Sequence, residues 1–275
     1  MGEFFHKDGM MEKEIQSVEN PRVKELVKLR ENRRFRYSER RFLLEGIRLS
    51  LDALYSKAEL LSLYYTKEAE NRYGEELEKL KEKAMETTLV STEVFKKIAD
   101  TKSPQGVLVV CRMLDKPEIR SKMKKNLPWL VLEKIADPGN MGTIFRSADA
   151  LGAALLLVGE GVDPYSPKVV RSAMGALFRV PFVMVKEASE AFSFLQNEQK
   201  ISYAAVPHRE NALLLSETVF EENAAIWIGN EGHGLTEETI NACDKRLTID
   251  MKGHAESLNA AVAASIVLWE LSKTF

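Results

Sequence analysis

Short, unbroken apolar runs recur through the second half of the chain, and stretches with helical spacing separate them. Such runs are typical of strands buried on both faces, and their alternation with helices favours a mostly parallel sheet between two helical layers. We therefore expect an α/β fold. The pattern predicts strands at 129–133, 155–158, 182–185, 203–206 and 224–228, and helices at 141–151, 166–178 and 188–196.

The last segment has a different pattern. An apolar run that begins at Leu247 breaks into a polar loop, and a helix is predicted to open at Glu256 and Ser257. From Leu258 to Leu271 almost every side chain is apolar or small. A helix that is apolar on all sides is ordinarily buried on all sides, and small residues let other backbone approach it. We expect a core element or a contact between subunits.

The first half predicts a smaller α/β domain of its own. Asn20 and Pro21 form a helix-start signal, and a charged stretch between Pro117 and Pro128 indicates a linker. The predicted helices are 20–36, 47–55, 75–84 and 92–99, and the predicted strands are 41–45, 60–66, 87–90 and 106–111. The expected divisions are a loose leader at 1–20, a substrate-binding domain at 21–112, the linker at 113–127 and a second domain at 128–275.

Composition narrows the class of protein. Hydrophobic residues make up 45% and charged residues 29% of the 275 residues, as in soluble globular proteins. No apolar stretch is long enough to cross a bilayer, and no signal-peptide pattern begins the chain. Cys111 and Cys243 match no metal-ligand spacing, and neither do the four histidines. We expect a cytoplasmic protein without a metal or a membrane partner.

Charge is unevenly distributed. Residues 21–48 hold ten Lys or Arg against four Asp or Glu, and residues 126–275 hold twelve against nineteen, so the first segment carries +6 and the second −7. Arginines alternate with aromatic rings at 33–37, a mixture suited to phosphates and bases. A polyanion would meet the N-terminal half first, although a solvated basic helix face would give the same count.

Three polar loops could carry chemistry. The first contains Asn140 and is followed on the next helix by Arg146, which would ordinarily be a surface ion-pair residue. The second, at 229–234, places three glycines around polar residues, which permits close approach of a planar ligand but also suits a plain turn. It matches neither G-x-G-x-x-G nor a P-loop. In the third, Ser257 belongs to no triad and would suit an N-cap.

Taken together, these segments resemble the SpoU (TrmH-like) family of the SPOUT methyltransferases. Three ordered motifs carry the resemblance: EKIADPGNMGTIFRSADALG at 133–152, IGNEGHGL at 228–235 and the segment at 249–270. The stretch SPKVVRSAMGALFRVP at 166–181 also looks like this family. The N-terminal half, which ends with TKSPQGVLVV at 101–110, resembles the ribosomal-protein-like RNA-binding domain often joined to the catalytic domain.

The resemblance implies a C-terminal parallel-sheet SPOUT domain with a deep trefoil knot, which topology rules alone would reject. It implies a homodimer formed through this domain and methylation of a ribose 2′-hydroxyl in structured RNA, either rRNA or tRNA. S-adenosylmethionine would bind in the knot near Gly229, Ile249 and Leu258.

The resemblance also assigns residues. The catalytic group would be Asn140, Arg146, Glu231, Ser257 and Asn259, and the RNA contacts would be Arg33, Arg34, Arg36, Arg41 and Arg171. An arginine is essentially never neutral, so we expect Arg146 to clamp a phosphate or the developing alkoxide instead of acting as the base. A non-catalytic RNA-binding protein with this fold and a Rossmann-type dehydrogenase are the alternatives. Intact motif residues disfavour the first, and the absence of a Gly-rich first turn disfavours the second.

Overall fold

A computed structural model of the protein describes residues 14–114, 127–207 and 211–274. The chain divides into two compact units, Met1–Arg112 and Met113–Phe275. The first thirteen residues of the expected leader and residues 115–126 of the expected linker lie outside the described ranges. Within those ranges no helix is long and apolar enough to cross a membrane.

The first unit is built on a four-stranded sheet in the order β1-β4-β2-β3. Strand β4 is antiparallel to both β1 and β2, whereas β2 and β3 are parallel, so this sheet is mixed. Its strands are β1 (Arg41–Glu45), β2 (Leu60–Tyr65), β3 (Glu86–Leu89) and β4 (Val107–Arg112). Its helices are α1 (Pro21–Glu31), α2 (Arg33–Glu39), α3 (Ile47–Tyr55), α4 (Lys67–Arg72), α5 (Gly74–Lys83) and α6 (Thr92–Ile98).

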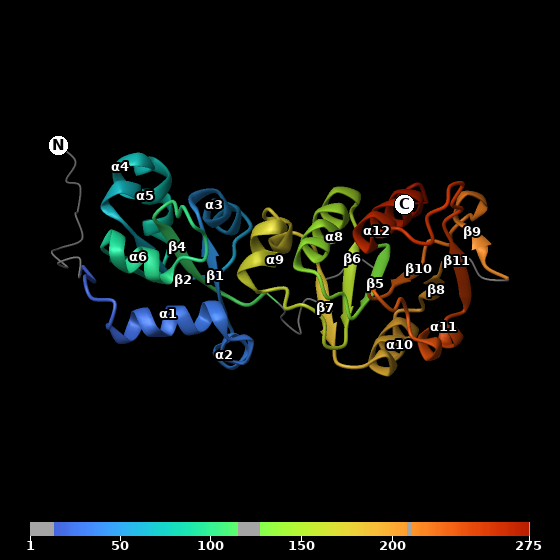
Figure 1. The fold of residues 1–275 in the computed structure, drawn as a ribbon. Coiled ribbons are helices and arrows are strands. Elements are labelled where there is room, and N and C mark those ends of the chain that lie inside the picture. The colour runs from blue at the N-terminus through green and yellow to red at the C-terminus, as the bar shows by residue number, and fades with distance from the viewer. Residues whose placement is uncertain (1–13, 115–126, 208–210, 275) are drawn as a thin grey trace. The chain divides into compact units, whose positions relative to one another are not determined.

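Helices α1 and α6 pack together on one face of this sheet, and α3 and α5 lie on the other (Figure 1). The segment before α1 also belongs to this unit. Ile15 is buried, its N–H donates to the Leu89 carbonyl at 2.9 Å, and its own carbonyl accepts from Ser91 at 3.1 Å. Ile15 is therefore held at the edge of the sheet and Val18 packs partly against the same core, so the expectation that the loose leader extends to residue 20 is wrong.

The single helix predicted at 20–36 is two helices. The Asn32 side chain accepts a hydrogen bond from the Phe35 N–H at 3.0 Å and so begins α2, while the Asn32 N–H donates to Lys28 and ends α1. Arg36 is buried, and its guanidinium donates to the carbonyls of Leu29 at 2.7 Å and Arg30 at 2.8 Å. These are carbonyls that the last turn of α1 leaves without helical partners, so Arg36 caps this helix.

The second unit holds a seven-stranded sheet in the order β7-β6-β5-β10-β8-β11-β9, and all its neighbouring strands are parallel. The strands are β5 (Trp129–Glu133), β6 (Ala154–Val158), β7 (Phe182–Val185), β8 (Ile201–Ala205), β9 (Leu213–Leu214), β10 (Ala224–Ile228) and β11 (Lys245–Thr248). The helices are α8 (Pro138–Leu151), α9 (Pro167–Ser172), η1 (Ala176–Phe178), α10 (Ala188–Asn197), η2 (Leu215–Glu217), α11 (Glu237–Ala242) and α12 (Ala260–Ser272).

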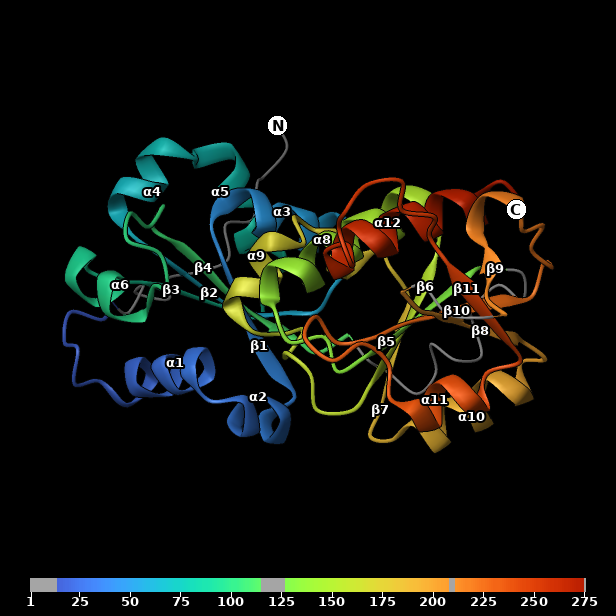
Figure 2. The same cartoon turned by 45° about the vertical axis from the view of Figure 1, so that its right-hand side comes forward.

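Both faces of this parallel sheet are covered, as the unbroken apolar runs predict. Figures 1 and 2 show α8 and α12 on one face and α10 and α11 on the other. Every residue of β5, β6 and β10 is buried, and the Trp227 ring stacks on Phe192 of α10 with centroids 4.5 Å apart. Because both faces of these strands are buried, their side chains are apolar on both sides, and the strands are recognisable in the sequence as continuous hydrophobic segments.

Two helices of the second unit differ from the predictions. The helix expected at 166–178 breaks into α9 and η1 because Met174 and Gly175 adopt positive φ angles of 48° and 81°. The last helix begins at Ala260, after Asn259 as its N-cap, and not at Glu256. It is also not buried on all sides, since Val262 is 47% and Trp269 is 58% exposed.

The capping role of Arg36 predicts a stability effect. Arg36→Ala should lower the free energy of unfolding by about 1–3 kcal/mol, because it removes two charged hydrogen bonds from a buried helix end. The matched control is Arg34→Ala, whose exposed side chain lies on the same helix. It should change the free energy by less than about 0.5 kcal/mol. Urea denaturation of the two variants and the parent measures both values, and equal stability of all three proteins would contradict the capping role.

Candidate active site

Three loops meet at the carboxyl edge of the seven-stranded sheet. They follow β5, β10 and β11; β5 and β10 are neighbours, and β11 lies beyond β8. Carboxyl ends of parallel strands share one edge, which is where open α/β sheets bind ligands. The third loop returns from β11 to α12, which packs against α8. The N-termini of both helices therefore lie beside the loop that follows β10.

The Glu231 carboxylate joins the first two loops. One oxygen accepts the Ala136 N–H at 3.0 Å, and the other accepts the Asp137 N–H at 3.0 Å and the Asn140 Nδ2 at 2.9 Å. Ala136 and Asp137 immediately precede α8, and Asp137 is its N-cap. A carboxylate at a helix N-terminus meets both free N–H groups and the positive end of the helix dipole.

A second link joins this pair to the third loop. The Asn140 side-chain oxygen accepts a hydrogen bond from the Asn259 Nδ2 at 3.0 Å. The Asn259 oxygen in turn accepts the N–H groups of Ala261 at 2.9 Å and Val262 at 3.2 Å, which caps α12. Glu231, Asn140 and Asn259 thus form one hydrogen-bonded chain across all three motifs, and each amide uses its oxygen and its nitrogen.

The protonation state of Glu231 follows from these contacts. Burial alone would raise the pKa of Glu231, but the hydrogen bonds from Asn140 and the backbone N–H groups of Ala136 and Asp137 outweigh burial and hold this pKa below its ordinary value. Hydrogen bonds donated to a carboxylate favour its ionised form. Glu231 is therefore an ionised acceptor near neutral pH and an unsuitable proton donor.

The loop that follows β10 is a tight hairpin. Asn230 and Gly234 exchange backbone hydrogen bonds of 2.9 and 3.1 Å, and the Asn230 side chain bonds the N–H groups of Gly232 and His233 and the Lys134 carbonyl. A Cβ at Gly229 would lie 2.1 Å from the backbone of Gly234 and Leu235. Glycine is thus required at 229 for the loop to close on itself.

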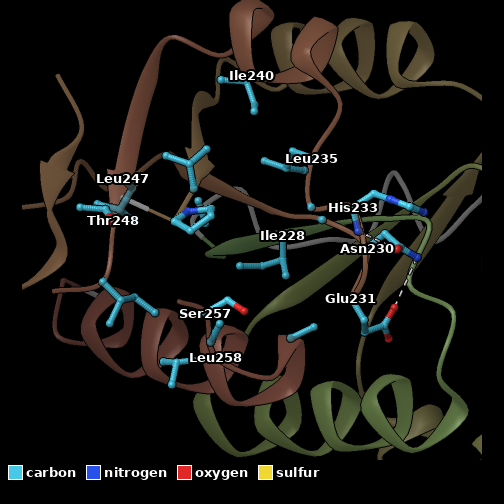
Figure 3. A pocket seen from close by; sticks show the side chains of 18 of the residues that line it. Ile228, Asn230, Glu231, His233, Leu235, Ile240, Leu247, Thr248, Ser257 and Leu258 are labelled. Atoms are coloured by element: carbon cyan, nitrogen blue, oxygen red, sulfur yellow. Dashed lines mark hydrogen bonds between the residues drawn. The ribbon is translucent and has the colours of Figure 1, made fainter. Parts of the chain in front are cut away.

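A pocket of about 360 Å³ opens between these loops (Figure 3). The three residues predicted to hold a cofactor, Gly229, Ile249 and Leu258, all line it, as do Glu231 and Ser257. Its lining also includes apolar side chains such as Leu247 and Val267. An apolar cavity with a few polar groups at its rim suits a small organic ligand. Asn140, Arg146 and Asn259 are not among the residues that line it.

Arg146 lies on α8, two turns after Asn140. Its side chain is exposed, and it makes no hydrogen bond or ion pair with the part of the chain that the structure describes. Arg146 therefore has no carboxylate partner among the described residues, and the structure gives no support to its interpretation as a surface ion-pair residue. The arginine remains available to an external anion.

The arginines proposed to contact RNA differ in availability. Arg36 is buried, and its guanidinium donates to backbone carbonyls at the end of α1. The prediction that Arg36 contacts RNA is therefore wrong, because its donors face the protein interior. Arg41 is paired with Glu25 at 2.6 Å and Glu39 at 2.8 Å, which neutralises its charge. Arg33 and Arg34 are exposed, and the Arg33 guanidinium lies 5.5 Å from the centre of the Tyr37 ring.

Arg171 lies in the other unit, on α9, and is half-buried. Because Arg171 belongs to the second unit, any RNA contact by this residue would be made by the sheet domain itself.

Two contributing residues were not predicted. Glu133, at the end of β5, is buried and accepts hydrogen bonds from the Thr236 N–H at 3.2 Å and the Thr239 hydroxyl at 3.1 Å, which fixes the start of α11. Asn230 closes the hairpin. An asparagine beside a glycine is a sequence signal for a side chain that bonds nearby backbone, whereas nothing local marks the partners of Glu133.

Comparison with known proteins identifies the family. The sequence model of the SpoU rRNA Methylase family matches residues 128–269, and that of the MRM3-like substrate binding domain matches residues 20–109. The chain belongs to the SpoU rRNA methylase family. This confirms the resemblance based on the three motifs and the expected parallel-sheet α/β fold with an N-terminal substrate-binding domain.

Several members of the SpoU family are similar over nearly the whole chain. The 23S rRNA (guanosine(2553)-2′-O)-methyltransferase RlmP of Bacillus subtilis is 31% identical over 94% of this chain and 99% of its own. The mitochondrial rRNA methyltransferase 3 of Homo sapiens is 29% identical over 90% of this chain and 71% of its own. A crystal structure of an AdoMet-bound rRNA methyltransferase from Sinorhizobium meliloti has a TM-score of 0.83, with 28% identity, 95% coverage of this chain and 97% of its own.

The ionised state of Glu231 predicts a pH-dependent contribution to stability. Glu231→Gln should lower the free energy of unfolding by about 1 kcal/mol at pH 7, because an amide nitrogen cannot accept the backbone hydrogen bonds. Since the folded-state pKa is depressed, this contribution is complete above the unfolded pKa and is lost as pH falls through the folded one.

Denaturation curves of parent and variant between pH 3 and 7 measure the difference. Glu256→Gln is the matched control: Glu256 is exposed in the third loop and makes no hydrogen bond within the described residues. A parent–variant difference that is as large at pH 3 as at pH 7 would show that the charge of Glu231 is not what holds the loops.

Proposed function

We propose that this protein transfers a methyl group from S-adenosylmethionine to a ribose 2′-hydroxyl of ribosomal RNA. The observation that carries this proposal is the pocket at the three motif loops, joined by the Glu231–Asn140–Asn259 chain, in a member of the SpoU rRNA methylase family. Relatives of similar length are named 23S rRNA 2′-O-methyltransferases, including one from Streptomyces viridochromogenes that is 29% identical.

The pocket fits the cofactor. Its volume of about 360 Å³ and its apolar lining suit a nucleoside, and the exposed Glu231 and His233 at its rim suit polar or cationic groups. When bound, S-adenosylmethionine supplies an electrophilic methyl group. The protein must hold the hydroxyl in line with that methyl group, and positioning of this kind supplies much of the rate.

Different residues supply structure and chemistry in this proposal. Glu231, Asn140 and Asn259 use their polar atoms on one another and on helix N-termini, so they fix the loops and act as positioning residues. Ser257 is exposed in the lining of the pocket and would hydrogen-bond near the ribose. Arg146, with its unused donors, would clamp a phosphate or the developing alkoxide. The proton would pass to phosphate or water.

The rest of the proposal concerns assembly. We place the RNA-binding function in the first unit, with Arg33 and Arg34 as contacts, and add Arg171 from the second. The C-terminal domain would form a homodimer, for which the exposed Trp269 of α12 is a candidate contact, and would carry the trefoil knot. The reaction would need no metal and would take place in the cytoplasm. A transfer RNA substrate remains an alternative within the same reaction.

The direct test compares ribosomal and transfer RNA from cells with and without the gene. We expect one or a few 2′-O-methylated positions in ribosomal RNA to disappear and to be restored by the purified protein with S-adenosylmethionine. Retention of every such position would favour the non-catalytic RNA-binding alternative, particularly if the protein bound RNA but not the cofactor.

Arg146 gives the sharpest prediction about mechanism. Arg146→Ala should slow methyl transfer on the order of a hundredfold or more, because it removes a charged group with several donors from the reacting oxygen. Arg146→Lys should restore little, because a point charge cannot reproduce a planar fork of donors. The measurement is single-turnover transfer of a labelled methyl group at saturating cofactor, with cofactor affinity and the unfolding midpoint as controls. Near-normal transfer by Arg146→Ala would remove this residue from the active site.

The uneven charge of the chain predicts that RNA and cofactor binding separate. A protein without residues 1–112 should bind S-adenosylmethionine with unchanged affinity but should hold RNA far more weakly, because it lacks the segment that carries +6 over residues 21–48. The affinity of the full chain for RNA should also fall steeply between about 50 and 200 mM salt as counterion release weakens. RNA affinity that survives truncation, or is flat across salt, would contradict this division.

A further inference from the structure

One wall of the pocket contains a hydroxyl group that has no partner. Thr248, the last residue of β11, lines the pocket and is 5% exposed (Figure 3). Its Oγ1 is buried and accepts or donates no hydrogen bond within the described residues. Buried hydroxyl groups in folded proteins are nearly always hydrogen-bonded, so an unpartnered one requires an explanation.

Two hydroxyl groups of similar burial in the same domain are partnered, whereas Ser166 Oγ, which does not line the pocket, is buried without a partner within the described residues. Thr239, which is 1% exposed, donates to Glu133 at 3.1 Å, and Ser202, which is 4% exposed, donates to Asp244 at 2.6 Å. Thr248 differs from all three residues because it lines a cavity that a ligand can enter.

The surroundings of Thr248 indicate which part of a ligand it meets. Backbone pairing places it beside Leu214 of β9 and next to Leu247, whose carbonyl accepts the Val206 N–H at 2.9 Å. Val206 and Pro207 line the same pocket and are apolar. Figure 3 shows Leu247 and Thr248 on the opposite side of the pocket from Asn230, Glu231 and His233. An apolar wall with a hydrogen-bonding group suits the nucleoside and not the zwitterionic amino acid.

We infer that Thr248 is a cofactor-recognition residue whose hydroxyl hydrogen-bonds a polar atom of the nucleoside half of S-adenosylmethionine. This inference rests on the proposed function. Such a bond favours a ligand that carries the matching polar atom, because a ligand without that atom leaves the hydroxyl as unsatisfied as it is in the unliganded protein. Filling the pocket would supply the partner that the unliganded fold does not.

The test uses Thr248→Val, which replaces the hydroxyl with a methyl group at nearly constant shape, and Thr248→Ser, which keeps the hydroxyl. Calorimetric titration of the full chain should show that Thr248→Val weakens S-adenosylmethionine about three- to tenfold, the range expected for one hydrogen bond. Thr248→Ser should bind within about twofold of the parent. S-adenosylhomocysteine and adenosine should show the same loss with Thr248→Val, because both retain the nucleoside.

Stability of the unliganded protein separates recognition from structure. Thr248→Val removes an unsatisfied buried hydroxyl, so its unfolding midpoint should equal or exceed that of the parent while its cofactor affinity falls. A variant that loses stability and affinity together would show a structural role and overturn the inference. Parent-like affinity in Thr248→Val would overturn it too, as would a loss seen with S-adenosylmethionine but not with adenosine. No cofactor binding by the parent would instead overturn the proposed function.

Discussion

A single carboxylate holds the catalytic edge of this protein together. Glu231 satisfies backbone N–H groups at the start of α8 from a loop 94 positions further along the chain, and it also fixes Asn140. Without this acceptor the helix start would have free N–H groups at a site that must stay open to a ligand. The carboxylate can do this only while it is ionised, and the donors that surround it keep it so.

The polar residues of the motifs divide into two kinds as a result. The Asn140 side chain hydrogen-bonds Glu231 and Asn259, and the Asn259 side chain hydrogen-bonds Asn140 and the first turn of α12. Substitution at either position should therefore disturb all three loops. Arg146 and Ser257 have exposed side chains that make no hydrogen bonds within the described residues. Loss of activity alone would not tell the two kinds apart, whereas cofactor affinity and loop stability would.

The sequence predicted most strands well because burial on both faces leaves an unbroken apolar run; the strands at Trp129–Glu133 and Ala224–Ile228 match their predicted bounds. It failed where one side chain decides the path of the backbone. Asn32 splits a helix that has a continuous basic pattern, and Asn259 moves the start of the last helix past Ser257. Such caps depend on local geometry that hydrophobic periodicity does not record.

The site was predictable only in part. Resemblance to a family picked out Glu231, Asn140 and Asn259, but only the folded chain shows that they are bonded to one another. Charge counting likewise could not separate the exposed Arg34 from the buried Arg36, because both contribute equally to a sum. A buried arginine is recognisable only from the carbonyls that it meets.

The position of α12 also constrains how the protein is made. The pocket is lined by Ala263 and Val267 of this terminal helix, and its outer loops are fixed through Asn259. A nascent chain on the ribosome therefore has no complete site until α12 has left the exit tunnel and packed against the sheet. Truncation within α12 that removed Ala263 and Val267 would leave the sheet with one wall of the pocket missing.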